Sequence, residues 1–208
     1  DDMSVQIFYM SGTGNTLFVA RELAKRFPKA KLVPLISQLD RAEIKTTGTT
    51  IGLVFPIYAL TMPGPVRHFL QRVDMRSADY IFAVATRHCS DKVFLDMDRY
   101  LKQSEATLDA YFSVETPCNY LPLFPAPTQD ESRALDANMK SRLDDIWSIV
   151  TQRQTHRPKD GALMHIIGRT LFLLVRTFME KVRLPNMVKS FYVDANCTGC
   201  KLCEKVCL

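Results

Sequence analysis

Two short segments of the 208-residue chain contain the residues best suited to chemistry, and they lie near its two ends. Residues 11–16 read Ser-Gly-Thr-Gly-Asn-Thr and include no lysine or arginine. Because glycine permits positive φ angles, successive backbone N–H groups of this loop can converge on one point. A helix is predicted to follow, and a helix N-terminus carries a partial positive charge. The loop is therefore suited to binding a phosphate monoester through hydrogen bonds.

Two better-known phosphate loops do not fit these residues. The Walker loop requires a lysine that is absent here, and the dinucleotide fingerprint requires a third glycine where this chain has Leu17. The stretch Phe8–Thr16 instead resembles the phosphate loop of flavodoxins. The alternative is an ordinary strand-to-helix turn that is rich in small residues.

Apolar runs of strand length alternate along the chain with helical patterns. These runs are mostly continuous, which is typical of parallel strands that are covered on both faces. The predicted strands are Val5–Met10, Leu32–Ile36, Thr50–Phe55, Tyr80–Thr86 and Ala110–Val114. The predicted helices are Thr16–Phe27, Pro65–Val73, Ser90–Gln103 and about Glu131–Gln154, with a short helix near Arg41–Ile44. The last long helix is expected to face the core with an apolar stripe of Leu135, Met139, Leu143, Ile146, Trp147 and Val150.

Strands that alternate with helices predict an α/β fold with right-handed crossovers. Five strands with a phosphate loop after the first predict a flavodoxin-like five-stranded parallel sheet of order 2-1-3-4-5, with helices on both faces. In that order the ligand crevice lies at the carboxyl ends of strands one, three and four. The unusual loops 11–16, 56–65 and 86–90 follow those three strands. We expect them to enclose the isoalloxazine ring of FMN, with the phosphate in the first loop.

The expected FMN-binding residues come from all three loops. The first loop binds the phosphate, Tyr58 stacks on the ring and Met62 lies near the ring edge. Positive charge on Arg87 or His88 would raise the midpoint potential of the flavin if either side chain points inward. The alternatives are that Tyr58 is simply a packed aromatic and that both cations face solvent. The full set is Ser11, Gly12, Thr13, Gly14, Asn15, Thr16, Pro56, Tyr58, Ala59, Met62, Thr86, Arg87, His88 and Cys89.

A proline-rich stretch follows the fifth strand. Four prolines within residues 116–128 exclude a helix and favour extended backbone. The stretch could cover the crevice or simply connect the strand to the next helix, and the plain connection is the simpler interpretation.

The second chemical segment is a run of four cysteines near the carboxyl end. The spacing is Cys-x2-Cys-x2-Cys-x3-Cys, as in bacterial ferredoxins, where thiolates ligate a 4Fe–4S cluster. Zinc is the alternative metal, but zinc sites usually combine two separated cysteine pairs. Cysteines crowded in this way indicate metal ligation in a reducing compartment rather than a disulfide framework. The predicted ligands are Cys197, Cys200, Cys203 and Cys207.

The run by itself does not supply a complete ferredoxin-type domain. In two-cluster ferredoxins the fourth cysteine of such a run ligates the other cluster, and a second run supplies the missing ligands. This chain contains no second run, and Cys89 and Cys118 belong to the predicted flavodoxin-like part. We therefore expect this chain to bind flavin but little or no intact cluster.

Together the two segments resemble the EFR1 family, in which a flavodoxin-like domain precedes a ferredoxin-type domain with two 4Fe–4S clusters. The resemblance is carried by Phe8–Thr16, Phe55–Tyr58, Asn119-Tyr120 and Phe191–Val193 followed by the cysteines. It implies a cytoplasmic redox protein that uses FMN and iron–sulfur clusters. The expected domains are residues 1–155, a helical linker at 156–190 and the incomplete start of a ferredoxin-type domain at 191–208.

A basic, apolar segment joins the two predicted domains. Residues 156–189 hold seven lysines and arginines against two carboxylates, which accounts for the net charge of +5. Residues 162–179 are nearly apolar enough for a membrane span, but His165, Arg169 and Arg176 interrupt them. A helix packed on the first domain or on a second copy in a homodimer is the simplest interpretation. Peripheral membrane contact and docking of an acidic redox protein are the alternatives.

Composition narrows the class of function. The part of the chain outside the basic segment is neutral, so a nucleic-acid-binding face is not expected. No secretory signal is recognisable, and we expect a cytoplasmic protein. No acid–base pair or nucleophilic triad is apparent, so the chemistry would be that of the cofactors. We predict flavin-dependent electron transfer between FMN, iron–sulfur clusters and a redox partner; the alternative is a non-catalytic flavin or redox sensor that binds a partner.

Overall fold

The structure is a computed structural model. It describes residues 3–58, 61–86, 92–117, 125, 127–158 and 192–206, together with a few single residues between 174 and 189. Most of the expected basic helix of residues 162–179 and most of the proline-rich stretch lie outside these residues.

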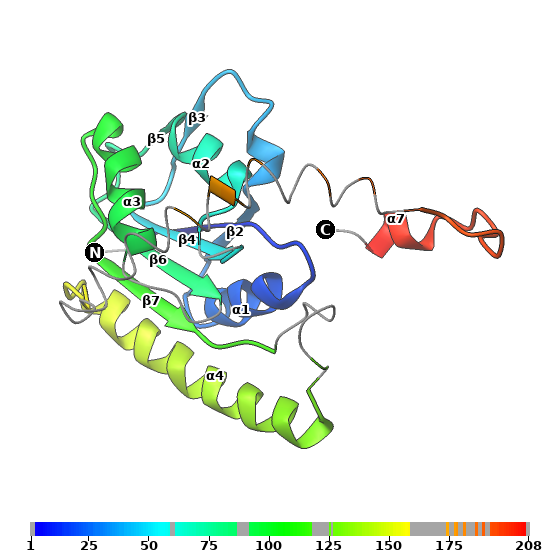
Figure 1. Cartoon of the computed structure of the whole chain (residues 1–208). Helices are drawn as coiled ribbons and strands as arrows, with labels where there is room; N and C mark the ends of the chain where they lie inside the picture. The colour runs from blue at the N-terminus through cyan, green and yellow to red at the C-terminus, as the bar shows by residue number, and fades with distance from the viewer. Residues whose placement is uncertain are drawn as a thin grey trace.

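Five parallel strands form the central sheet (Figure 1). Their order is β2-β1-β4-β6-β7, which is 2-1-3-4-5 when only these five strands are counted. Because all four neighbouring pairs are parallel, every strand ends at the same edge of the sheet. The strands are β1 (Val5–Tyr9), β2 (Lys31–Pro34), β4 (Thr50–Pro56), β6 (Tyr80–Thr86) and β7 (Ala110–Val114).

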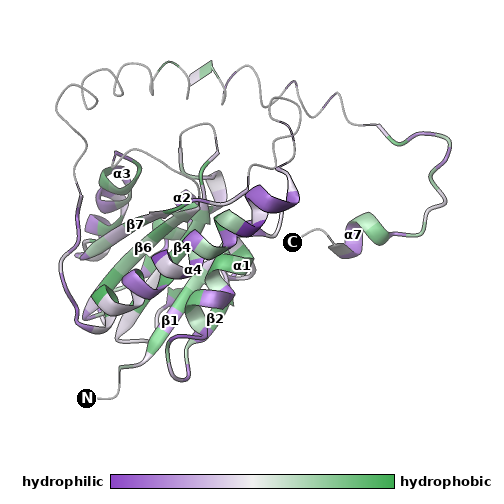
Figure 2. Cartoon of the chain, turned by 90° about the horizontal axis from the view of Figure 1, so that it is seen from below, coloured by the Kyte–Doolittle hydropathy of each residue, from purple (hydrophilic) through white to green (hydrophobic). Residues whose placement is uncertain are grey.

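Two pairs of helices cover the two faces of the sheet. Buried residues of α1 and α4 share one apolar cluster, and those of α2 and α3 share the other. Figure 2 shows largely apolar strands between helices that also carry hydrophilic residues. The fold is therefore flavodoxin-like, as predicted. The helices are α1 (Asn15–Ala24), α2 (Gly64–Leu70), α3 (Lys92–Leu101) and α4 (Gln129–Thr151).

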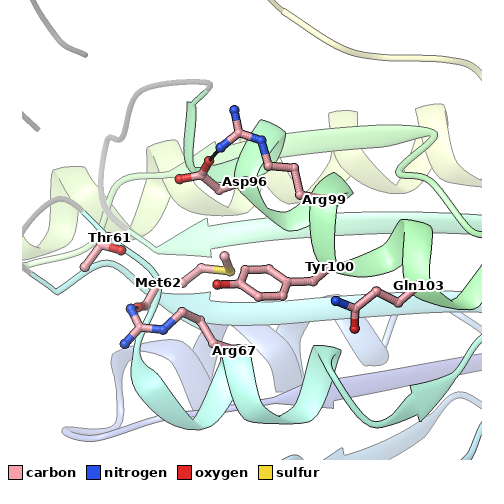
Figure 3. Close-up of a pocket in the computed structure, with 7 residues that line it drawn as sticks. All are labelled: Thr61, Met62, Arg67, Asp96, Arg99, Tyr100 and Gln103. Carbon is pink, nitrogen blue, oxygen red and sulfur yellow. Dashed lines mark hydrogen bonds and ion pairs between the residues drawn. The ribbon is translucent and has the colours of Figure 1, made fainter. Parts of the chain in front are cut away.

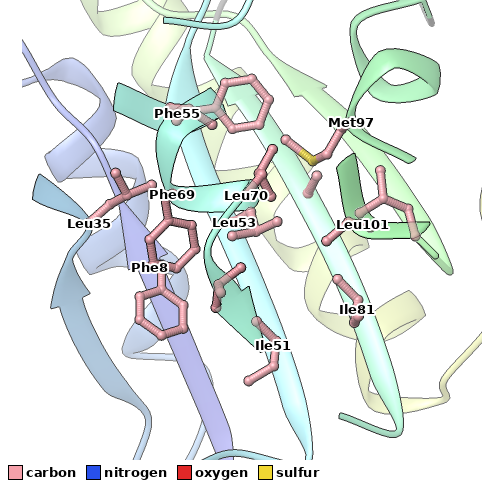
Figure 4. Packing of buried hydrophobic residues seen from close by; sticks show 14 of the residues in the cluster. Phe8, Leu35, Ile51, Leu53, Phe55, Phe69, Leu70, Ile81, Met97 and Leu101 are labelled. Atoms are coloured by element: carbon pink, nitrogen blue, oxygen red, sulfur yellow. The ribbon is translucent and has the colours of Figure 1, made fainter. Parts of the chain in front are cut away.

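The alternation of side chains along each strand supplies both cores. In β1, Ile7 faces the α1–α4 cluster and Phe8 faces the α2–α3 cluster, where its ring lies 4.8 Å from that of Phe69. Figure 4 shows this second cluster, with Phe55 and Met97 among its residues. Burial on both faces explains why the strands read as continuous apolar runs.

The region between β2 and β4 differs from the prediction. No helix forms at Arg41–Ile44. A 3₁₀ turn, η1 (Ile36–Gln38), follows β2 instead, and β3 (Ile44–Lys45) pairs in parallel with β5 (Val73–Asp74) as a small second sheet. The predicted helix was wrong because Ile44 is buried in the α2–α3 cluster as a strand residue, and a two-residue strand leaves no periodic pattern.

Helix and strand ends shift by a few residues from the predicted ones. Helix α1 ends at Ala24 and α2 at Leu70, while a second 3₁₀ turn, η2 (Lys102–Ser104), follows α3. Helix α4 begins with a capping box in which Thr128 and Glu131 hydrogen-bond reciprocally. Trp147 was expected on its buried stripe but is 41% exposed. It lies beside the buried line Met139, Leu143, Ile146 and Val150 rather than on it.

After α4 the chain lies along the outer side of β7. The His156 N–H donates to the Asp109 carbonyl, and the Tyr111 N–H donates to the His156 carbonyl. The imidazole of His156 stacks on Phe112 with ring centroids 4.9 Å apart. Arg157 donates to the carboxylate of Asp98 and to the Leu108 carbonyl. Residues 154–158 therefore act as a strap on the outermost strand, and they belong to the first domain.

The cysteine-bearing segment contains one short helix, α7 (Leu202–Val206). Residues 192–205 are exposed throughout. Among the residues that the structure describes, no helix is long and apolar enough to cross a membrane.

Candidate functional site

The loop of residues 11–14 holds its own shape by an internal hydrogen bond. The Gly14 N–H donates to the Ser11 hydroxyl at 3.1 Å, and Ser11 is buried. Gly14 adopts φ 99° and ψ −31°, a conformation that side-chain-bearing residues rarely adopt. Ser11 therefore shapes the loop, while Gly12 and Thr13 are exposed at its surface.

Helix α1 begins at this loop without a side-chain cap. Gly14 is the N-cap residue and has no side chain to accept from the first turn, and that turn holds no carboxylate. The first N–H groups of a helix lack intrahelical partners, and an anion is favoured next to them. The donors at this helix start therefore fit a phosphate group, although no lysine or arginine belongs to the loop.

A buried hydroxyl pair joins the helix start to the end of β6. The Thr16 and Thr86 hydroxyls lie 2.8 Å apart, and each can donate to the other. Both side chains are buried. Of the expected FMN-binding residues, these two are thus brought together beneath the loop.

Tyr58 comes from the end of β4 and lies over Gly12. Its backbone exchanges two hydrogen bonds with Thr61, at 3.1 and 3.0 Å. An ideal Cβ on Gly12 would lie 2.3 Å from the Tyr58 hydroxyl oxygen, so a larger residue at position 12 would require the phenol to shift. The Tyr58 side chain is part-covered, with 44% of the residue exposed, and burial raises the pKa of its hydroxyl.

The proline-rich stretch also reaches the loop. The Asn15 side-chain amide donates to the Pro117 carbonyl at 2.8 Å. The start of the stretch therefore lies at the crevice, in addition to connecting β7 to α4. Tyr58 after β4 thus contacts this loop, while the end of β6 and the segment after β7 contact the first turn of α1 next to it.

Other predicted site residues fall into two groups. Pro56 ends β4 and pairs in register with Thr86, and Met62 is only 3% exposed within the α2–α3 cluster. Ala59, Arg87, His88 and Cys89 lie outside the described residues, so the cationic loop after β6 stays a prediction.

A pocket of about 270 Å³ adjoins this region between α2 and α3 (Figure 3). Met62 and the ring of Tyr100 lie side by side within it, and the Arg99–Asp96 ion pair lies on one side. Sequence reasoning missed this pocket because most of its residues are ordinary polar positions on helices, and only helix packing brings them together. Its lining residues are Thr61, Met62, Arg67, Asp96, Arg99, Tyr100 and Gln103.

The cysteine run provides three exposed, free thiols among the described residues. Cys200 lies between Gly199 and Lys201, which both have positive φ angles. Hydrogen bonds from the Leu202 backbone and the Thr198 side chain hold the pKa of Cys200 below its ordinary value. No group of three or more metal-ligating side chains gathers at one point within the part of the chain that is described. Cys89, Cys118 and Cys207 lie outside that part.

The fold has counterparts among solved structures. It matches rubredoxin oxygen:oxidoreductase of the anaerobe Desulfovibrio gigas with a TM-score of 0.41 and 17% identity, over 68% of this chain and 36% of that one. The Trp repressor binding protein of Bacillus subtilis matches with a TM-score of 0.42 and 12% identity, over 68% of this chain and 99% of that one.

A third match is the Flv1 flavodiiron core of Synechocystis sp. PCC6803, with a TM-score of 0.35 and 11% identity, over 70% of this chain and 37% of that one. The chain thus spans little more than a third of two of these three proteins. At such identities the likeness concerns the fold alone. No protein-family model and no curated protein matches the chain.

Proposed function

We propose that the domain of residues 3–158 binds FMN and that the protein transfers electrons through it. The observation that carries this proposal is the convergence of three strand ends on an uncapped helix start. Tyr58 after β4 contacts the loop that follows β1, and Thr86 of β6 and Pro117 after β7 contact the first turn of α1. Ligands of open α/β sheets bind at this edge, next to the strand where the order reverses.

The chain's own residues would bind and orient the cofactor. The N–H groups at the start of α1 would hold the phosphate, and the buried Thr16–Thr86 pair would hold the start of α1 against the end of β6. The loop contributes no charged side chain, so recognition depends on placed donors rather than on a cation. When bound, FMN would supply the one- and two-electron chemistry that this constellation lacks.

We also propose that the cysteine run is the iron–sulfur part of the same electron path. The ferredoxin-type spacing of the cysteines supports a cluster over a purely structural role. The four thiolates of the run would ligate iron, and the group they hold would supply one-electron chemistry next to that of the flavin. The resemblance to the EFR1 family supports the same pairing.

The visible absorption spectrum of the purified protein tests the flavin part. We expect bound flavin that is released on denaturation as FMN, and apoprotein that quenches the fluorescence of added FMN stoichiometrically. Absence of flavin on purification together with no FMN binding by the apoprotein would contradict the proposal.

Anaerobic reconstitution with iron and sulfide, followed by metal and sulfide analysis, tests the cysteine run. We expect sub-stoichiometric iron that depends on the cysteines, since one run does not complete a cluster. About four irons per chain would contradict that expectation and show a complete cluster. Zinc without sulfide would instead identify the alternative metal site.

A further inference from the structure

Tyr58 is held at the phosphate end of the proposed site. Its hydroxyl oxygen is so close to Gly12 that an added Cβ would come within 2.3 Å of it, whereas the neighbouring Cζ would remain 3.5 Å away. The two backbone hydrogen bonds with Thr61 fix the backbone from which the phenol extends. The hydroxyl therefore lies against the exposed Gly12 of the loop.

A phosphate bound in the loop accepts several hydrogen bonds, and the Tyr58 hydroxyl can donate one of them. A phosphate monoester carries about two negative charges near neutral pH. Within the loop, the buried Ser11 hydroxyl accepts from Gly14 and keeps its own O–H as a donor, while the Thr16 hydroxyl shares a hydrogen bond with that of Thr86. A neutral O–H donor at the loop surface would add a charge-assisted hydrogen bond, the stronger kind. The Tyr58 hydroxyl is protonated near neutral pH, since a tyrosine pKa is ordinarily about 10, and burial raises the pKa of this hydroxyl further.

We propose that the Tyr58 hydroxyl donates a hydrogen bond to the phosphate of the bound mononucleotide and so selects phosphorylated flavin over riboflavin. The inference rests on the proposed FMN function and refines it. Tyr58 then acts through its hydroxyl at the phosphate, in addition to any contact of its ring.

The test compares Tyr58→Phe with the wild type, using FMN, riboflavin and inorganic phosphate as separate probes. Tyr192→Phe is the matched control, since Tyr192 is 87% exposed in the cysteine-bearing segment. We expect Tyr58→Phe to weaken FMN binding about tenfold or more, the size of a hydrogen bond to a charged group, and to leave the riboflavin dissociation constant unchanged. The stabilisation of the wild type by millimolar phosphate in thermal melts should weaken in parallel.

The other outcomes overturn the inference in distinguishable ways. If Tyr58→Phe weakened the binding of FMN and of riboflavin equally, Tyr58 would contact only the flavin ring. Tighter FMN binding by Tyr58→Phe would show that the hydroxyl obstructs the loop. A wild type that binds phosphate but no flavin would refute the proposed function, while the phosphate comparison would still decide the role of Tyr58. Binding of neither ligand would refute both.

A double-mutant cycle tests the placement itself without any ligand. Gly12→Ala should lower the melting temperature of the wild type, because its Cβ collides with the Tyr58 hydroxyl. In the Tyr58→Phe background the nearest ring atom is at ordinary contact distance from an added Cβ. Gly12→Ala should therefore lower the melting temperature by less than half as much as it does in the wild type. Equal losses in both backgrounds, or no loss in either, would overturn the placement of the hydroxyl.

Discussion

At the scale of single residues, glycine and hydroxyl side chains determine the form of the phosphate-type loop. Gly14 supplies a backbone conformation that only glycine adopts without strain, and Ser11 fastens that turn by accepting its N–H. Gly12 leaves room for the Tyr58 phenol. The form of the loop therefore depends on the two glycines, which have no side chain, as much as on the hydroxyl of Ser11.

Replacing Gly14 with alanine tests this dependence on conformation. Nothing lies within 4 Å of an added Cβ, so the cost comes only from the φ angle of 99°. We expect a loss of about 1–3 kcal/mol in the free energy of unfolding, measured by urea denaturation, and weaker FMN binding.

Gly64→Ala is the matched control. Gly64 opens helix α2, and an added Cβ there would meet only the Arg67 guanidinium, at 4.0 Å. Because Pro65 restricts the helical backbone of a preceding residue that has a Cβ, we expect some loss of stability here, but a smaller one than for Gly14→Ala. Equal effects of the two substitutions would contradict a conformational role for Gly14.

At the scale of elements, side-chain contacts between distant segments fasten the strand ends to one another. The Thr16–Thr86 pair joins α1 to β6, and the Asn15 amide joins α1 to the segment after β7. Within the sheet, Gly52 of β4 lies opposite Phe82 of β6, whose ring occupies the space a side chain would take. These contacts position the candidate site on strands and helices rather than on loops alone.

A double-mutant cycle on the hydroxyl pair measures one of these contacts. Thr16→Val leaves the Thr86 hydroxyl buried without its partner, which costs about 1–3 kcal/mol of unfolding free energy. Thr16→Val/Thr86→Val removes both polar groups, so we expect it to be less destabilised than the sum of the single variants. Additive losses in chemical denaturation would show that the two hydroxyls do not interact.

The strap along β7 makes stability depend on pH. Burial, and then the nearby charge of Arg142, lower the pKa of His156 in the folded protein. The unfolded chain, with a histidine pKa of about 6.5, then binds the proton more readily. The stabilisation is present above that value and is lost as the pH falls through the folded pKa.

We therefore expect the melting temperature to fall between pH 7.5 and pH 5.5, and to fall less in His156→Phe. Phenylalanine can keep the stacking on Phe112 but carries no titratable group. Identical pH dependence of the two proteins would exclude His156 as a source of the effect.

At the scale of the whole molecule, the two chemical segments are separate along the chain. Every contact described at the phosphate-type loop comes from residues before 118, and Cys197, Cys200 and Cys203 are exposed. Flavin binding should therefore be independent of the cysteines, although electron transfer through both would require them.

Replacing all four cysteines of the run with serine tests this independence. We expect the FMN dissociation constant and the melting temperature to remain those of the wild type, while iron uptake on reconstitution is lost. A marked loss of FMN affinity would show that the cysteine-bearing segment contributes to the flavin site.

The sequence alone determined the features that depend on local pattern. Continuous apolar runs and helical periodicity predicted the five strands, their order and the helices on both faces, with the last two strands at their observed bounds. The loop of residues 11–16 and the cysteine run were likewise visible as short motifs. The small β3–β5 sheet escaped prediction because two-residue strands carry no periodic pattern.

Only the tertiary structure decided which side chains meet. Thr16 and Thr86 are 70 residues apart in the chain, and Asn15 and Pro117 are 102 apart. The placement of Tyr58 on Gly12, the pocket between α2 and α3 and the exposure of Trp147 also depend on how whole elements pack. Local patterns show which face of an element is buried. Strand register and helix packing, which set distances between remote residues, are determined by the complete fold.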